Sequence, residues 1–267
     1  MNTEAQILTR NGTPLHYWLT DGPADSPLIV FTHGAGCDHQ MFDEQVKALT
    51  GKYRVLTWDV RGHGLSRPIG DAFTLRIVVD DLLAILDQLG VQQAIIGGQS
   101  MGGNVAQEIC FLHPERVLAM LLIDCVCNTN SLSAFEKWAV SLTPTILRWY
   151  PYETLLKQTA TTVSRKPDVQ KYIYAVMKPI PKADIVTIMQ ETTGALHPDP
   201  NYRIPKPFLL VRGEHDDAGA IKKQGAAWAA REPNCTSFII PNAGHNSNQD
   251  NPADFNRIML DYLGTIK

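Results

Sequence analysis

The sequence predicts an α/β fold in which a mostly parallel sheet carries helices on both faces. Short, continuous runs of Val, Ile and Leu recur along the chain, and such runs are typical of strands buried in a parallel sheet. Segments with helical spacing of apolar residues alternate with these runs, as the crossovers of a parallel sheet require. The 267 residues are enough for one large domain of this kind.

The order of the expected elements follows from these patterns. Residues 6–9 and 15–19 alternate around Asn11-Gly12, which predicts an antiparallel edge hairpin. The expected buried strands are 27–32, 53–58, 93–96, 117–123, 207–211 and 236–240. The expected helices are 42–49, 75–89, 221–230 and 252–263, and the second of these is followed by Gly90, a common helix stop.

The alternation stops between residues 128 and 199. Prolines divide helical-looking pieces rich in Trp, Tyr and Met, and no convincing strand run is present. We expect a helical insertion, 128–199, in a core formed by 1–127 and 200–267. Since ligands of open α/β sheets bind at the carboxyl ends of the strands, a cap that lines the site is favoured over helices that only pack on the core. Trp138 and Trp149 are its candidate pocket residues.

Composition argues against several classes of partner. The net charge is −3, the pI is about 6.2 and no basic stripe is present, so nucleic acid and membrane surfaces are not expected partners. No secretory signal is visible, and no apolar run approaches the roughly 20 residues of a spanning helix. Five scattered cysteines indicate reduced thiols of a cytoplasmic protein: Cys37, Cys110, Cys125, Cys127 and Cys235. The sequence leaves the oligomeric state open.

The most informative motif is Gly-Gln-Ser-Met-Gly at 98–102. The pentapeptide alone is a weak signal, but an apolar run precedes it and a helical pattern follows it, which is the context of a tight strand-to-helix turn. In such a turn the serine oxygen is held out at the top of a sheet. Ser100 is therefore the candidate nucleophile, and a serine nucleophile needs a base to take its proton.

His245 is the candidate base because it follows the last expected strand, 236–240, on the sheet edge that also carries Ser100. The candidate acid is Asp216, which follows the strand 207–211. The alternatives for the acid are Asp217 and Glu214 in the same loop and Asp124 at the end of 117–123. A metal cluster of His215 with Asp216 and Asp217 is disfavoured, because three adjacent residues do not easily face one ion.

Two backbone amides are the candidates for an oxyanion hole. Met101 directly follows Ser100 at the expected helix start, and Ala35 lies in the small-residue loop His33-Gly34-Ala35-Gly36 after the strand 27–32. Gly36 is the alternative to Ala35, and Gly34 and Gly36 are also candidate pocket residues. His33 is interpreted as a brace of this loop rather than as a group that reacts.

Together these motifs resemble the α/β-hydrolase superfamily over nearly the full chain. The segments that carry the resemblance are 33–36 (His-Gly-Ala-Gly), 59–66 (Asp-Val-Arg-Gly-His-Gly-Leu-Ser), 98–103 (Gly-Gln-Ser-Met-Gly-Gly), 213–216 (Gly-Glu-His-Asp) and 244–245 (Gly-His). The resemblance implies an eight-stranded type of sheet with a helical cap and no cofactor. It also implies Ser100, His245 and Asp216 as the catalytic triad, with Ala35 and Met101 as oxyanion donors.

The expected reaction is hydrolysis of a carboxylic ester, lactone or thioester of a small to medium, partly apolar substrate through an acyl-enzyme. Relatives that use an aspartate nucleophile are excluded, since Ser100 stands in that position. The same triad in relatives also serves carbon–carbon hydrolysis, peracid formation (perhydrolases or haloperoxidases) and acyl transfer. A carbon–carbon hydrolase needs a cation for an acid substrate, for which the insertion offers Arg148, Arg165, Lys157 and Lys171. A ligand-binding sensor that keeps the fold is the alternative outside catalysis.

Overall fold

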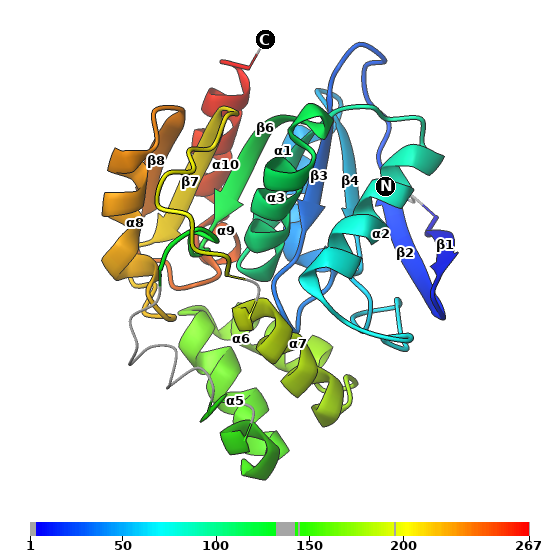
Figure 1. Cartoon of the computed structure of the whole chain (residues 1–267), viewed down its shortest axis with the longest axis vertical. Helices are drawn as coiled ribbons and strands as arrows, with labels where there is room; N and C mark the ends of the chain where they lie inside the picture. The colour runs from blue at the N-terminus through cyan, green and yellow to red at the C-terminus, as the bar shows by residue number, and fades with distance from the viewer. Residues whose placement is uncertain (1–3, 132–141, 144, 195, 267) are drawn as a thin grey trace.

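The computed structural model describes residues 4–131, 142–143, 145–194 and 196–266. These residues form one eight-stranded sheet with the order β1-β2-β4-β3-β5-β6-β7-β8 (Figure 1). The strands are β1 (Gln6–Arg10), β2 (Thr13–Leu19), β3 (Leu28–Thr32), β4 (Arg54–Trp58), β5 (Ala94–Gln99), β6 (Val117–Ile123), β7 (Phe208–Gly213) and β8 (Cys235–Ile240). The prediction of a mostly parallel α/β sheet is confirmed.

The sheet is antiparallel at one edge only. The strands β1 and β2 form the expected hairpin, and β2 pairs antiparallel with β4. Asn11 and Gly12 of the hairpin turn have φ of 45° and 75°, the left-handed region that a tight two-residue turn requires. From β4 to β8 every pair of neighbours is parallel, so the carboxyl ends of these strands meet at one edge.

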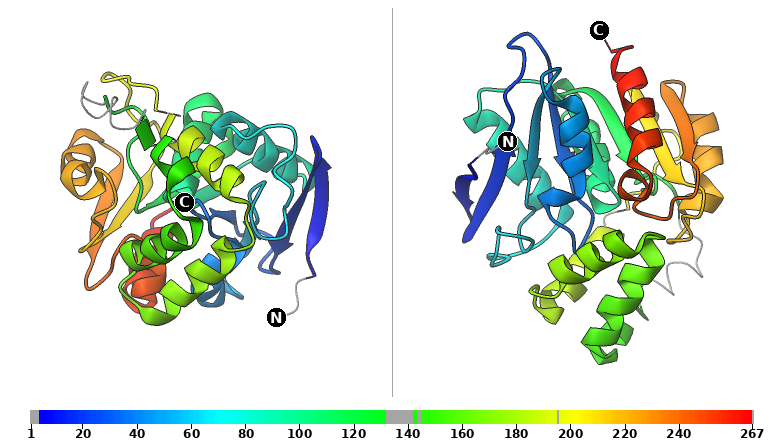
Figure 2. Two further views of the ribbon diagram at one scale, coloured as in Figure 1. Left: turned by 90° about the horizontal axis from the view of Figure 1, so that it is seen from below. Right: turned by 180° about the vertical axis from the view of Figure 1, so that it is seen from behind.

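Helices cover both faces of the sheet. Helices α2, α3 and α8 lie on the face toward the viewer in Figure 1, and α1 and α10 lie on the face seen from behind in Figure 2. Each face has its own buried apolar cluster, as a sheet covered on both sides requires. The bounds are α1 (Asp43–Leu49), α2 (Leu75–Gln88), α3 (Met101–Leu112), α8 (Ile221–Arg231), α9 (Ser247–Asp250), α10 (Pro252–Leu263) and the 3-10 turns His39–Phe42 and Pro114–Arg116.

The helices between β6 and β7 lie together at the carboxyl edge of the parallel strands (Figure 1). They are α5 (Tyr152–Val163), α6 (Pro167–Met177) and α7 (Lys182–Gly194). The two ends of this segment run side by side at its base. The amide of His197 donates to the carbonyl of Asn128 (2.9 Å), and the amide of Asp199 donates to the carbonyl of Thr129 (3.0 Å). The segment therefore leaves the sheet and returns to it at neighbouring points.

Two further observations concern the chain as a whole. All five cysteines are free thiols. Within the described residues, no helix combines the length and the apolar character needed to cross a membrane.

Candidate active site

Ser100 lies in a sharp turn between β5 and α3. Its φ of 52° and ψ of −114° are rare for a residue with a side chain, and such strain is typical of functional turns. Two glycines make the turn possible. A Cβ on Gly98 would collide with the backbone of Gly102, and a Cβ on Gly102 would collide with the carbonyl oxygen of Thr32. The helix can therefore begin directly against β3, and the turn is anchored by the bond from the Ser100 amide to Ile123 O (2.9 Å).

His245 lies in the loop between β8 and α9, and hydrogen bonds fix the backbone on both sides of it. The amide of Gly244 donates to Asp250 Oδ2 (2.7 Å), and the amide of Asn246 donates to the carbonyl of Val163 in α5 (2.9 Å). The carbonyl of His245 accepts a hydrogen bond from Gln99 Nε2 (2.7 Å). This loop is therefore held by the residue before Ser100 and by the helical segment together.

Asp216 pairs with His245. The Nδ1 atom of His245 lies 3.1 Å and 3.2 Å from the two carboxylate oxygens of Asp216, and both side chains are buried. The amide of Ala218 donates to Asp216 Oδ1 (3.0 Å) and fixes the carboxylate in turn. With Nδ1 engaged by the carboxylate, Nε2 is the ring nitrogen left to exchange a proton with a reacting group.

The surroundings of His245 favour its protonated form. Burial by itself lowers the pKa of an imidazole, but the hydrogen bond and charge of Asp216, with a further contribution from the charge of Asp124, outweigh it and raise the pKa of His245 above its usual 6.5. Asp216 thus stabilises the imidazolium that forms when His245 takes a proton, as a general base requires.

The alternative acids lie elsewhere. Asp217 forms an ion pair with Lys222 (3.2 Å), and Glu214 accepts from the amide of Asn242 (3.0 Å). Neither carboxylate contacts the ring of His245 in the described structure. Of the carboxylates weighed from the sequence, Asp216 is therefore the one that the fold brings to the histidine.

Asp124 is a buried brace beside this pair, a role that the sequence did not reveal. Its Oδ1 accepts from the amide of Gly213 and its Oδ2 from the amide of Ser247, both at 2.8 Å. It therefore joins the ends of β6 and β7 to the first residue of α9. Burial, aided by the negative charge of Asp216, raises the pKa of Asp124 to about 8, whereas the bond from Ser247 and the charge of His245 lower it.

The loop after β3 forms a tight turn against Ser100. The amide of Cys37 donates to Gly34 O (3.1 Å), and Gly36 has φ of 81°, which indicates a type II turn with Ala35 at its first corner. A Cβ on Gly34 would collide with the side-chain amide of Gln99 and would lie 3.4 Å from Ser100 Cβ. The turn therefore brings its backbone close to the serine.

The other candidate oxyanion donor is Met101, the first residue of α3, whose amide has no partner within the helix. The side chain of His33 stabilises the turn after β3 through two hydrogen bonds. Its Nε2 accepts from the amide of Val60 (3.0 Å), and its Nδ1 bonds to Gly34 O (2.8 Å). Burial, the largest effect, lowers the pKa of His33, so the ring is neutral and its two nitrogens serve as donor and acceptor.

Ser100 and His245 line the same cavity of about 520 Å³. Its other described lining residues are Asn104, Cys125, Val126, Thr192, Thr193, Leu196, Ala218, Gly219, Ala220, Ile221 and Lys223. They come from α3, α7, α8 and the loops at the carboxyl edge of the sheet, so the inserted segment and the core both contribute to the wall.

The predicted pocket residues have different positions. Gly34 lies against Ser100, whereas a Cβ on Gly36 would meet the Met177 side chain of α6 at 2.9 Å. Trp149 is 87% exposed and is not among the residues that line the cavity, because its ring extends to the surface of the helical segment. Trp138 lies outside the described residues.

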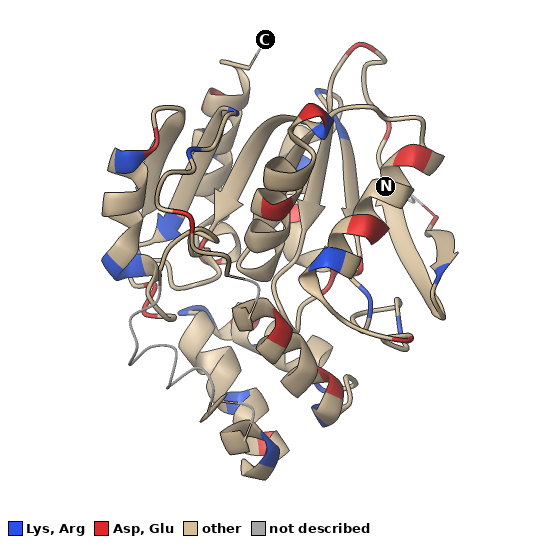
Figure 3. Cartoon of the chain, viewed as in Figure 1, with Lys and Arg blue, Asp and Glu red and all other residues tan. Residues whose placement is uncertain are grey.

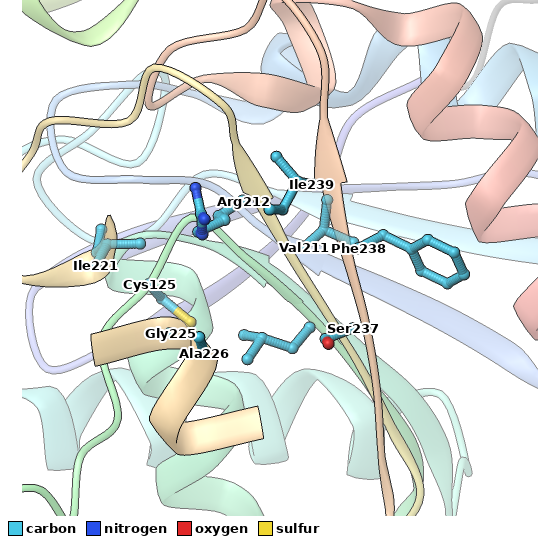
Figure 4. Close-up of a pocket in the computed structure, with 10 residues that line it drawn as sticks. Cys125, Val211, Arg212, Ile221, Gly225, Ala226, Ser237, Phe238 and Ile239 are labelled. Carbon is cyan, nitrogen blue, oxygen red and sulfur yellow. The ribbon is translucent and has the colours of Figure 1, made fainter. Parts of the chain in front are cut away.

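A second cavity, of about 370 Å³, lies between α8 and the strands β7 and β8 (Figure 4). It shares Cys125 and Ile221 with the first cavity but does not reach Ser100 or His245. It is therefore a neighbour of the candidate site rather than part of it. Among the described residues, no cluster of His, Cys, Asp or Glu has an arrangement suited to a metal ion.

Comparison with known proteins identifies the family. Residues 27–252 match the family model described as the alpha/beta hydrolase fold, which spans most of the chain. The chain belongs to the α/β-hydrolase family. This α/β-hydrolase is 28% identical to 3-oxoadipate enol-lactonase 1 of Acinetobacter baylyi, over 98% of its own length and 97% of the relative. It is 28% identical to the putative carbamate hydrolase RutD of Pseudomonas savastanoi pv. phaseolicola, over 90% and 95% of the two chains.

Solved structures agree with this assignment. The enol-lactonase from Burkholderia xenovorans LB400 superposes on this α/β-hydrolase with a TM-score of 0.84 and 26% identity, covering 97% of this chain and 100% of that one. The relatives are named as enol-lactonase and carbamate hydrolase, so the chain is an enzyme of the hydrolase class.

Proposed function

We propose that this enzyme hydrolyses carboxylic esters or lactones through Ser100, His245 and Asp216. The observation that carries the proposal is that the imidazole paired with Asp216 lines the same cavity as Ser100. The similarity to enol-lactonases supports the carbonyl chemistry, since a lactone is a cyclic ester. The strained turn at Ser100 supports its role as the nucleophile.

The reaction would proceed in two halves. Ser100 Oγ attacks the carbonyl carbon while His245 Nε2 takes the hydroxyl proton, and Asp216 stabilises the imidazolium. The amides of Ala35 and Met101 are the candidate donors to the oxyanion of the tetrahedral intermediate. His245 then passes its proton to the leaving alkoxide as the carbon–oxygen bond breaks. Water attacks the acyl-enzyme by the same route, releases the acid and restores the serine hydroxyl.

We further propose that residues 128–199 act as a cap. Helices α5, α6 and α7 lie over the carboxyl edge of the sheet, and Thr192, Thr193 and Leu196 line the cavity with Ser100. A wall supplied by the inserted segment would exclude water and select substrates, as lids commonly do.

One experiment separates an esterase from a protein that only binds ligands. The enzyme is treated with a fluorophosphonate, which labels activated serines, and is assayed in parallel with 4-nitrophenyl acetate. We expect steady turnover and a label that peptide mass spectrometry maps to Ser100, with no label on Ser100→Ala. Labelling without turnover would favour a ligand sensor. A label on another serine, or none on correctly folded protein, would overturn the assignment of Ser100.

A further inference from the structure

We infer that Lys223 makes the cavity beside Ser100 selective for substrates that carry a carboxylate in addition to the scissile ester or lactone. The inference rests on the proposed function and deepens it, because it names a chemical class of substrate. It begins from the make-up of the cavity wall. Among its described lining residues, Lys223 is the one side chain with a permanent positive charge, and none is an aspartate or a glutamate.

The charge of Lys223 is not neutralised by a neighbour. Lys223 lies in the first turn of α8, next to Lys222, whose ammonium group pairs with Asp217 at 3.2 Å. No described carboxylate lies within ion-pair distance of Lys223. Figure 3 shows basic residues at the end of α8 that faces the helical segment, which is the side of the cavity. An exposed ammonium group at a cavity wall is thus free to meet an anionic group of a ligand.

None of the described lysines and arginines of the inserted segment is among the residues that line the cavity with Ser100. Lys157 pairs with Glu153 and Lys171 with Asp168, both on the surface, and Arg148 lines a separate cavity with Lys182. Of the four cations weighed from the sequence, Arg148, Arg165, Lys157 and Lys171, none is among the described residues that line this cavity. The lysine that does line it, Lys223, comes from the start of α8.

Apart from Lys223, and from Ser100 and His245, which serve the reaction, the other polar side chains of the wall are already hydrogen-bonded. The Asn104 amide donates to Asn128 Oδ1 (2.6 Å), and the hydroxyls of Thr192 and Thr193 donate to carbonyls one turn earlier in α7 (2.8 and 2.9 Å). A carboxylate in this cavity would find its strongest partner in Lys223. The substrate would then lie with its reacting carbonyl at Ser100 and its anionic end toward α8.

The size of the effect follows from the exposure of Lys223. An ion pair at the protein surface is weak because water screens it, and one that excludes some water is stronger. We therefore expect about a tenfold preference for an anionic over a matched neutral substrate. Added salt should reduce this preference, since it screens exposed charges.

The test uses two substrates that differ at the end remote from the nitrophenyl ester: mono-4-nitrophenyl adipate, which has a free carboxylate there, and its neutral methyl ester. The measured quantity is the ratio of kcat/KM for the anionic substrate to kcat/KM for the neutral one. In Lys223→Met, which keeps the length of the side chain, this ratio should fall about tenfold, mainly through a higher KM for the anionic ester. Lys223→Arg should retain most of the preference. Lys222→Met is the matched control, because Lys222 is its neighbour in the same turn, and it should leave the ratio within twofold of wild type.

Each outcome decides between the two proposals. A ratio that falls in Lys223→Met, is kept in Lys223→Arg and declines with salt only when Lys223 is present supports the inference. An unchanged ratio in Lys223→Met, or an equal loss in Lys222→Met, overturns the inference and leaves the esterase assignment in place. Failure of the wild-type enzyme to turn over either ester, with no fluorophosphonate label on Ser100, would instead overturn the proposed function itself.

Discussion

The side-chain amide of Gln99 donates a hydrogen bond of 2.7 Å to the carbonyl oxygen of His245, 146 positions along the chain. Gln99 is the last residue of β5 and directly precedes Ser100. One buried contact therefore ties the strand that ends at the candidate nucleophile to the loop that carries the candidate base. The collision that a Cβ on Gly34 would make with the Gln99 amide shows how tightly the same group is enclosed.

Replacing Gln99 by Met tests the role of this hydrogen bond. The substitution keeps the length of the side chain but leaves the buried carbonyl of His245 without its donor, which should lower the free energy of unfolding by about 1–3 kcal/mol. We expect kcat for 4-nitrophenyl acetate to fall about tenfold with little change in KM, since misplacement of the base affects the transition state more than binding. Steady-state kinetics and urea unfolding measure the two effects.

Gln93→Met is the matched control for this substitution. Gln93 Nε2 also donates to a backbone carbonyl, that of Glu115 (2.6 Å), but on the exposed surface away from the cavity. It should change the free energy of unfolding by less than about 0.5 kcal/mol and leave kcat unaltered. Equal effects of the two substitutions on kcat would contradict a positioning role for Gln99.

The losses of activity caused by substituting the nucleophile and the base should not be additive in the double variant. We expect Ser100→Ala and His245→Ala each to lower kcat by roughly 10⁴-fold or more, and the double variant to lose little further, because triad residues act as a unit. Initial rates at high enzyme concentration measure these losses. If the fall in kcat of the double variant equalled the product of the two single falls, the two groups would act independently.

Three aspartate-to-asparagine substitutions test the assignment of the acid. Asp216→Asn should lower kcat by about 10³-fold, less than loss of the nucleophile or base. Asp217→Asn should leave kcat within about twofold, because its partner is Lys222 on the surface. Asp124→Asn should chiefly lower stability, by about 1–3 kcal/mol, because an amide nitrogen would then face a backbone N–H that now has an acceptor. A folded Asp124→Asn variant that loses more activity than Asp216→Asn would transfer the acid role to Asp124.

The pH dependence of kcat/KM should reflect the pKa of His245. The neutral imidazole is the active base, and its pKa is raised above 6.5 because the bond and charge of Asp216 outweigh burial. The logarithm of kcat/KM should therefore fall on the acidic side with a midpoint above 6.5, since a higher pKa means that protonation begins at higher pH. In Asp216→Asn the midpoint should move downward. A wild-type midpoint well below 6.5 would argue against this pairing.

One physical rule made it possible to predict from the sequence both the sheet and the place where the site residues lie. Parallel strands end at a common edge, so Ser100, Asp216 and His245 could be assigned to neighbouring loops once the strands before them were recognised. The two bonds of Asp124 were not predictable in this way. They depend on how far β6 and β7 run beside each other, and hence on the register that places the amide of Gly213 beside Asp124.

Side chains of the helical segment and of α8 were harder to predict. Trp149 is aromatic and lies in a segment expected to cover the site, but which way a helix turns its side chains depends on packing that no local pattern encodes, and the ring is exposed. Lys223 is one of two adjacent lysines in a helix, so its sequence gives no sign that it differs from Lys222. The difference arises because Lys223 lines the cavity and because, within the described part of the chain, Lys222 has an aspartate partner and Lys223 does not.

The paired amide–carbonyl bonds at the base of the inserted segment, from His197 to Asn128 and from Asp199 to Thr129, make it separable from the rest of the fold. Because the entry and exit of the segment are joined, a change in its length need not change the spacing of β6 and β7. The graft would still have to provide the acceptor at Val163 and the hydroxyl of Ser164, which donates to Asp250 at 2.5 Å. Since Thr192, Thr193 and Leu196 line the cavity with Ser100, exchanging the segment would change part of the cavity wall, while the contacts of Val163 and Ser164 would hold the histidine loop.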